Sequence, residues 1–275
     1  MQKVESSSLF SRFPKAPRPR GFLCFRPMDT PTNLDDPARI DELRRLILRK
    51  PALRRLYAEV YEKYAECLAR CPSDGIAVEL GAGPSFVKDT LPEVVTSDTI
   101  PYDGVDTVVD AMDMPYEDGE LRALFLMNVF HHIPDVGKFL SEAQRCLRPG
   151  GRVYMFDEYP GWISTPILKH GHYEPFEPDA EEWSFASTGP LSGANGALAW
   201  IVFKRDRAIF DERYPQLRLD RFDPCVPLRY WTSGGLKKWT LVPGPTFGAA
   251  TWLDERIISI SPRFGSFADI EIVKT

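Results

Sequence analysis

The chain has 275 residues, is 43% hydrophobic and carries a formal net charge of -5 at pH 7. This length and composition can bury the core of one large or two small domains. The negative balance gives no overall attraction to phosphate backbones, and no apolar run approaches the roughly 20 residues of a membrane span, so we expect neither a nucleic-acid partner nor a transmembrane segment.

The beginning of the chain differs from the rest in composition. The first thirty residues hold six Lys or Arg against two acids, contain four prolines and show no apolar period. We interpret residues 1–33 as a flexible basic leader, with an organelle-targeting peptide or a basic docking arm as alternatives. The five cysteines are scattered and do not repeat at zinc-site spacing, which favours reduced thiols in a cytoplasmic protein.

Two amphipathic helices are predicted within residues 34–72. Asp35 or Asp36 caps the first helix, and its apolar face comprises Ile40, Leu43, Leu46 and Ile47. The second helix follows Pro51, and its apolar face comprises Leu53, Leu56, Tyr57, Val60, Tyr61, Tyr64 and Leu68. We interpret this segment as an N-terminal helical cap that either covers a substrate mouth or packs against the sheet edge. The tyrosines are interpreted as core residues.

Residues 73–275 alternate short apolar runs with helical stretches, which predicts an α/β domain with a mostly parallel, Rossmann-like sheet of about seven strands. The first five strands are expected near residues 76–80, 94–97, 107–109, 123–128 and 152–156. A helix with Phe139, Leu140 and Ala143 facing inward is expected between the last two of these strands. Ligands are then expected at the carboxyl ends of the strands.

The helices of this sheet are predicted to be reduced. Only about eight residues separate Asp98 from the third strand, which is too few for a crossover helix. After Tyr159 the chain becomes irregular and aromatic, and we expect a C-terminal elaboration on the substrate side. There "ALAWIVFK" (197–204), "PQLRLDRF" (215–222) and "FADIEIVKT" (267–275) are predicted strands, and "TWLDERIISI" (251–260) is a predicted helix.

The stretch "VELGAGPSF" (78–86) contains the glycine turn of a cofactor site. Phe86 stands where a dinucleotide fingerprint needs its third glycine, and no Gly-Lys-Ser/Thr follows as a phosphate-binding loop requires. Glu79 beside the turn suits a cation better than a pyrophosphate, while Asp98 at the end of the second strand can accept both ribose hydroxyls. This pattern favours a positively charged nucleoside that lacks phosphate.

Four segments in order between Ala77 and Tyr159 extend this pattern: "VELGAGPS", "VVTSD", "VVDAMDMPYEDGELRALFLMNVFHHIPD" and "CLRPGGRVYMFDE". Together they resemble class I S-adenosylmethionine-dependent methyltransferases, most closely the small-molecule branch that includes quinone-biosynthesis enzymes. The tail resembles uncharacterised bacterial methyltransferases associated with surface-glycan or lipid modification. One departure from the family pattern is Ser85, which stands in place of the third glycine.

The resemblance implies S-adenosyl-L-methionine as cofactor and assigns a set of cofactor-binding positions: Glu79, Gly81, Gly83, Asp98, Asp110, Ala111, Met112 and Asn128. Glu79 and the glycines would surround the methionine part, and Asp98 would bind the ribose. Asp110 would accept from the adenine amino group, while the backbone at Ala111 and Met112 meets the ring edge. Asn128 would line the pocket near the sulfonium.

Methyl transfer to a hydroxyl requires alignment and a base. His131 and His132 follow the fourth strand and are candidate bases, with His132 slightly preferred, and Glu158 at the end of the fifth strand is a third candidate. We therefore expect O-methylation of a small-molecule or glycan-linked acceptor. The alternatives are a cofactor-binding partner without catalysis and a nucleotide-dependent oxidoreductase.

The segment "KHGHYEPFEPD" (169–179) holds a second cluster of polar residues. His170, His172 and Glu174 alternate as metal ligands on a strand can, but the spacing fixes no further ligand and a proline-rich loop is a poor scaffold. We therefore expect no metal site here. Substrate contact by His170, His172 or Tyr173 is the favoured interpretation.

Overall fold

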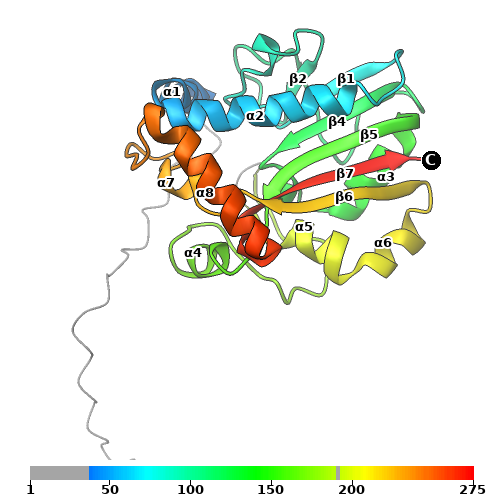
Figure 1. The fold of residues 1–275 in the computed structure, drawn as a ribbon. Helices are drawn as coiled ribbons and strands as arrows, with labels where there is room; N and C mark the ends of the chain where they lie inside the picture. The colour runs from blue at the N-terminus through cyan, green and yellow to red at the C-terminus, as the bar shows by residue number, and fades with distance from the viewer. Residues whose placement is uncertain (1–36, 190–192) are drawn as a thin grey trace, which may run out of the picture.

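The computed structural model describes residues 37–189 and 193–275, so the predicted leader at residues 1–33 lies outside it. Within the described residues, seven strands form one sheet in the order β3-β2-β1-β4-β5-β7-β6 (Figure 1). The strands are β1 Ile76–Leu80, β2 Val95–Asp98, β3 Thr107–Val108, β4 Leu121–Met127, β5 Leu147–Glu158, β6 Leu217–Cys225 and β7 Phe267–Lys274. Neighbouring strands from β3 to β5 are parallel, and β7 is antiparallel to both β5 and β6. The predicted Rossmann-like α/β sheet is confirmed.

Helices cover both faces of this sheet. They are α1 Pro37–Arg49, α2 Pro51–Leu68, α3 Val136–Cys146, α4 Ser164–His170, α5 Leu198–Trp200, α6 Arg207–Arg213, α7 Arg229–Thr232 and α8 Phe247–Ile260. Short 3-10 turns occupy Val87–Asp89, Phe130–His132, Gly244–Thr246 and Pro262–Phe264. No described helix is long and apolar enough to cross a membrane.

Side chains that alternate along each strand contribute to two hydrophobic clusters, one on each face of the sheet. In β1, Val78 and Leu80 join the cluster that contains α3 and α5, whereas Ala77 joins the cluster that contains α2. Because side chains alternate along a strand, Glu79 points with Ala77 toward α2. A single carboxylate is thereby placed under a helix that is rich in tyrosine.

The two predicted N-terminal helices are present, and they lie in different surroundings. Helix α2 packs directly on the sheet, where the ring of Tyr64 stacks on Phe125 with 4.4 Å between centroids. Helix α1 instead contributes Ile40 and Leu43 to a cavity lining. At their junction the buried Lys50 donates from Nζ to the carbonyl of Gly235 at 2.6 Å, which ties the helical pair to the loop after α7.

The expected shortage of helices is confirmed. Residues 99–106, between β2 and β3, contain no helix, and only the Val87–Asp89 turn follows the glycine loop. The sequence also places β6, β7 and α8 correctly, although α8 begins at Phe247. The cofactor side of the sheet is therefore framed by loops.

One predicted strand is wrong. Residues 197–204 form helix α5 followed by a π-helical turn over Ile201–Arg205. Just before this helix, which begins at Leu198, the side chain of Asn195 accepts from the N–H of Ala197 at 3.0 Å. The run is apolar on every side and its aliphatic residues are buried beneath the sheet, so it lacks the period that separates a buried helix from a strand.

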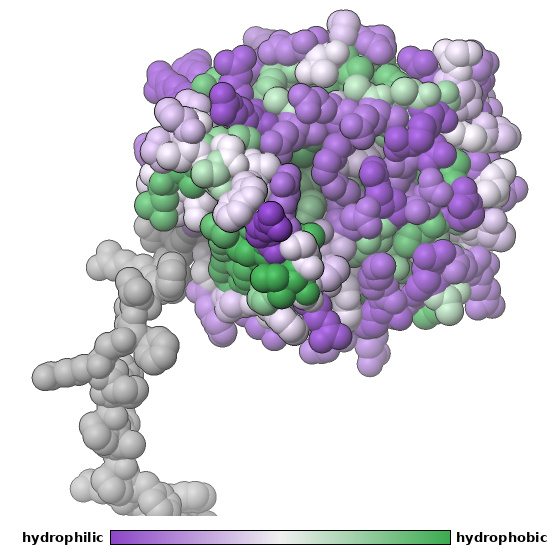
Figure 2. All heavy atoms as spheres, viewed as in Figure 1, coloured by the Kyte–Doolittle hydropathy of each residue, from purple (hydrophilic) through white to green (hydrophobic). Residues whose placement is uncertain are grey.

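Figure 2 shows a mostly hydrophilic surface with an apolar area over α8. In that helix Trp252, Leu253 and Ile260 are exposed. Isolated exposed apolar side chains are common on proteins, and this area lies outside the cavity described next.

Candidate functional site

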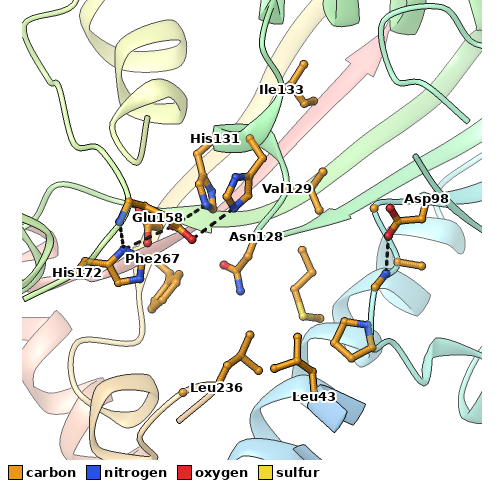
Figure 3. A pocket seen from close by; sticks show the side chains of 18 of the residues that line it. Leu43, Asp98, Asn128, Val129, His131, Ile133, Glu158, His172, Leu236 and Phe267 are labelled. Atoms are coloured by element: carbon orange, nitrogen blue, oxygen red, sulfur yellow. Dashed lines mark hydrogen bonds and ion pairs between the residues drawn. The ribbon is translucent and has the colours of Figure 1, made fainter. Parts of the chain in front are cut away.

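A cavity of about 1320 Å³ opens at the carboxyl ends of strands β1 to β5. All the candidate site residues named from the sequence line it. Figure 3 shows Asn128 near its centre, with Asp98 toward one end and His131, Glu158 and His172 toward the other. We call these the turn end and the imidazole–carboxylate end.

The glycine turn at the turn end has little room for side chains. Gly81 has a φ of +62° there, and a Cβ on it would come within 2.6 Å of a methyl of Val129. Gly83 has a φ of +49°, and its N–H donates to Oδ2 of Asp98 at 2.9 Å. The turn thus presents bare backbone to the cavity, as a close ligand approach requires.

Glu79 is buried beside this turn. Only 2% of the residue is exposed, and its Oε2 has no hydrogen-bond partner among the described residues. Burial raises the pKa of the Glu79 carboxyl to about 8. A cation in the cavity would stabilise the charged form of this side chain.

The loop after β3 brings Asp110, Ala111 and Met112 to the cavity wall. Oδ1 of Asp110 accepts from the N–H of Met112 at 2.8 Å, which closes a local Asx turn. The expected backbone contact at Met112 therefore uses an N–H that already has a partner in this structure. Asp110 as a whole is exposed.

Asn128 immediately follows β4 and has a φ of 55°, a left-handed conformation that Asn adopts more readily than most residues. Its N–H donates to the carbonyl of Phe156 at 2.8 Å, while its buried Oδ1 has no partner among the described residues. A strained backbone that holds an unpaired amide at a cavity is typical of a functional position.

His131 lies in the 3-10 turn after β4 and is fixed from behind. Its Nδ1 donates to Oδ1 of the fully buried Asp157 at 2.8 Å. Asp157 is itself held by the N–H groups of Phe130 and Glu158, at 2.9 and 2.8 Å. The other ring nitrogen, Nε2, lies 3.5 Å from Oε2 of Glu174.

His132 has a similar arrangement with different partners. Its Nδ1 donates to the carbonyl of Gly193 at 3.1 Å, and its Nε2 lies 3.7 Å from Oε1 of Glu174. The two imidazole rings are 4.2 Å apart. Both histidines therefore direct Nε2 toward one carboxylate.

Burial and nearby charges at the imidazole–carboxylate end give its ionisable residues different pKa values. Burial alone would lower the pKa of His131, but the charges of Asp157 and Glu158 outweigh it and hold that pKa well above its ordinary value. Burial and the charge of His131 lower the pKa of His132 to about 4. Burial raises the pKa of Glu158 to about 8. Near neutral pH, His131 is charged and His132 is a weak base.

Glu158 is the residue of this cluster whose carboxylate has an oxygen without a hydrogen-bond partner in the described part of the chain. It ends β5, 5% of it is exposed, and its Oε2 has no hydrogen-bond partner among the described residues. The side chain lines the cavity and faces the same space as His131 and His172 (Figure 3). Oε2 itself is held in the cavity wall against Gly196.

The three residues predicted for substrate contact take different positions. His172 lies in the loop after α4, and its Nδ1 is 3.5 Å from Oε2 of Glu174. Tyr173 is 37% exposed and its ring stacks on His172. His170 lies at the exposed end of α4, apart from the cluster of ionisable groups but on the cavity wall.

Sequence reasoning missed how much depends on Glu174. It was considered only as a possible neighbour of His170 and His172, yet its carboxylate lies within 3.7 Å of three imidazole nitrogens. Tyr102 was also missed, and its hydroxyl donates to the carbonyl of Gly83 at 2.8 Å. Local spacing signals neither contact, because the first joins a loop to a turn 42 positions earlier in the chain and the second joins two loops.

Part of the chain is similar to known proteins. Residues 79–155 match the family model described as a methyltransferase domain. A tocopherol O-methyltransferase of Arabidopsis thaliana is 44% identical over 46 residues, which are 17% of this chain and 13% of that protein. A sarcosine/dimethylglycine N-methyltransferase of Halorhodospira halochloris is 34% identical over 82 residues, 26% of this chain and 29% of that protein.

Among solved structures, the geranyl diphosphate C-methyltransferase of Streptomyces coelicolor A3(2), with S-adenosyl-L-homocysteine, is similar with a TM-score of 0.48. The sequences are 16% identical, and the match covers 90% of this chain and 88% of that one. The chain spans less than a third of the length of the curated relatives given above. The matched segment contains the glycine turn, Asp98, Asn128 and both histidines. Residues 79–155 therefore match a methyltransferase domain.

Proposed function

We propose that this protein transfers a methyl group from S-adenosyl-L-methionine to a hydroxyl oxygen of a small-molecule or glycan-linked acceptor. The proposal depends on one observation. A single cavity is lined both by the backbone of the glycine turn and by a cluster of imidazoles and carboxylates. The cavity of about 1320 Å³ exceeds the range of roughly 300–1,000 Å³ that is usual for a single ligand, which leaves room for an acceptor.

The turn end suits the cofactor. Gly81 has no room for a Cβ because Val129 lies against it, so its backbone stays bare at the cavity, and the unpaired buried oxygen of Glu79 suits a positively charged methionine part. Asp98 uses Oδ2 to accept from Gly83, so the remaining acceptor capacity of its carboxylate can serve the ribose hydroxyls. When bound, the cofactor supplies an electrophilic methyl group on a sulfonium.

The adenine ring of the cofactor would bind beside the Asx turn of Asp110. With Oδ1 engaged by Met112, Oδ2 is the atom that would accept from the adenine amino group. Ala111 and Met112 would then contact the ring edge, and Asn128 would lie near the sulfonium. These assignments follow the order of the family segments along the chain.

The imidazole–carboxylate end supports oxygen as the acceptor atom. A neutral amine needs no base, whereas a hydroxyl must lose its proton, and a buried cluster of this kind is suited to take it. Among the three candidate bases, Glu158 is favoured over His131 and His132, because near neutral pH His131 already carries a proton and His132 is a weak base. His172 and Tyr173 would contact the acceptor, with His170 at the rim.

The proposal is tested with cofactor labelled in its methyl group and small-molecule and glycan extracts of the cells that naturally make the protein. We expect label in an alkali-stable ether product, together with stoichiometric S-adenosyl-L-homocysteine. Cofactor binding by calorimetry without any labelled product would instead support the non-catalytic alternative. Label found on nitrogen or carbon would refute the oxygen assignment alone.

A further inference from the structure

Three side chains at the imidazole–carboxylate end converge on one small space. One ring nitrogen of His131, one of His132 and a carboxylate oxygen of Glu174 all lie within 4.8 Å of one another. Two imidazoles and one carboxylate form a donor set that binds zinc and other divalent transition metals in proteins. The set also lines the open cavity, so an ion and a further ligand have a path to it.

Both imidazoles are oriented as metal ligands commonly are. Each Nδ1 donates to a fixed acceptor, which is Asp157 for His131 and the Gly193 carbonyl for His132. In the neutral ring this fixes the tautomer and leaves the lone pair on Nε2, so a metal ion would have to displace the proton that His131 carries near neutral pH. A carboxylate or carbonyl behind the ligating histidine is the usual outer support of a zinc site.

The separations between the donor atoms fit an intervening ion. Nε2 of His131 and of His132 lie 3.5 and 3.7 Å from the oxygens of Glu174, which is too long for good hydrogen bonds. Two ligand atoms that are each about 2.1 Å from one tetrahedral ion lie about 3.4 Å apart. A small inward movement of these side chains would therefore complete the coordination.

A separate observation points to a missing cation. Glu158 has a buried Oε2 without a partner, and a carboxylate oxygen of Glu158 lies within 4.8 Å of ligand atoms of His172 and Glu174. Among residues 37–189 and 193–275, no Lys or Arg forms an ion pair with Asp157, Glu158 or Glu174. Asp157 is buried and Glu174 is partly buried, and their charged partners among these residues are histidines, an environment that can attract a divalent cation.

We infer that His131, His132 and Glu174 bind a zinc ion, with an open coordination position that faces the cavity. This inference revises the expectation from the sequence that the chain has no metal site. It deepens the proposed function and rests on it only for the use of the ion: zinc would bind the acceptor hydroxyl as a Lewis acid and make its proton easier to remove.

The resulting step balances without any further reagent. The acceptor O–H bond breaks and its proton passes to Glu158. An oxygen lone pair then forms the O–C bond to the methyl group, while the C–S bond breaks and its electron pair stays on sulfur. No oxidation or reduction occurs, and Glu158 returns its proton to solvent.

The test uses the full chain with a purification tag that contains no histidine, stripped of metal with a chelator. We expect one Zn²⁺ per chain by calorimetry, with a Kd below about 10 µM, and Co²⁺ to give the visible absorption of a four- or five-coordinate site. His132→Ala and Glu174→Gln should each weaken binding at least about 100-fold. His170→Ala should leave it within twofold, because His170 lies at the same cavity but outside the donor set.

Circular dichroism and cofactor binding of each variant establish that it is folded, which separates this test from the test of methyl transfer. Failure of the folded wild-type protein to bind Zn²⁺ or Co²⁺ at 100 µM would refute the inference. Binding unchanged by both His132→Ala and Glu174→Gln would refute it equally. Zinc binding without any methyl transfer would confirm the site and overturn only its proposed use.

Discussion

The two ends of the cavity are built in different ways. The turn end comes from residues close in sequence: Gly81 and Gly83 follow β1 directly, and Asp98 reaches the turn from the neighbouring strand β2. The imidazole–carboxylate end joins residues from the turn after β4, the end of β5 and the loop after α4. The turn end follows a local sequence pattern, whereas the residues of the imidazole–carboxylate end come together only when the chain folds.

This difference suggests separate tasks for the two ends. A backbone turn with one carboxylate can hold the same cofactor in many proteins, because its contacts depend little on the surrounding loops. A cluster assembled from loops can change with the acceptor while the sheet stays the same. Variants at each end should therefore affect different measurements.

The largest effect is expected for Glu158→Gln. The amide keeps the size of the side chain but cannot take a proton, so label transfer should fall about 10²- to 10⁴-fold. Cofactor affinity should change less than threefold, because Glu158 belongs to the other end of the cavity (Figure 3). Glu177→Gln is a matched control in the same region but outside the cavity lining. A parallel loss of cofactor affinity would contradict the separation of the two ends.

A smaller effect is expected for Asp98→Asn. The amide oxygen can still accept from Gly83, but the charge and the second acceptor for the ribose are lost, so Kd should rise about 10- to 100-fold. Calorimetry should show the same rise for S-adenosyl-L-methionine and S-adenosyl-L-homocysteine, since both carry the ribose. Asp103→Asn on the exposed part of the same loop is the control. An unchanged Kd would remove Asp98 from the cofactor site.

The same contrast explains what the sequence could predict. The strand pattern, the reduced helices and the carboxyl-end location of the site followed from periodicity and chain length, and the structure confirms them. Residues 197–204 were misread because a run that is buried on every side has no period. The role of Glu174 could not be read because no spacing rule joins a loop to a turn 42 residues earlier. Local chemistry was predictable, and contacts set by tertiary folding were not.

The smallest effect concerns the proton on Glu79. Its pKa of about 8 exceeds the ordinary value of 4.5. Between these two pH values, the folded cofactor-free protein therefore binds a proton that the unfolded chain does not. The free energy of unfolding falls as the pH rises from about 4.5 to about 8. A cationic cofactor favours the ionised carboxylate and must displace that proton below pH 8. Cofactor affinity should therefore rise about 3- to 10-fold between pH 6 and pH 8.

The tyrosines of α2 that lie near Glu79 do not cause this pH dependence of cofactor affinity. Tyr57, Tyr61 and Tyr64 of α2 have pKa values raised by burial, which keeps them neutral in this range. Calorimetry on Glu79→Gln provides the comparison, because it retains any titration of the cofactor itself and removes only that of the carboxyl. The difference in slope between wild type and variant measures the charge that the turn end supplies. Equal slopes would show that Glu79 keeps its proton when the cofactor binds, and the preference of this turn for a cation would then have to come from Asp98.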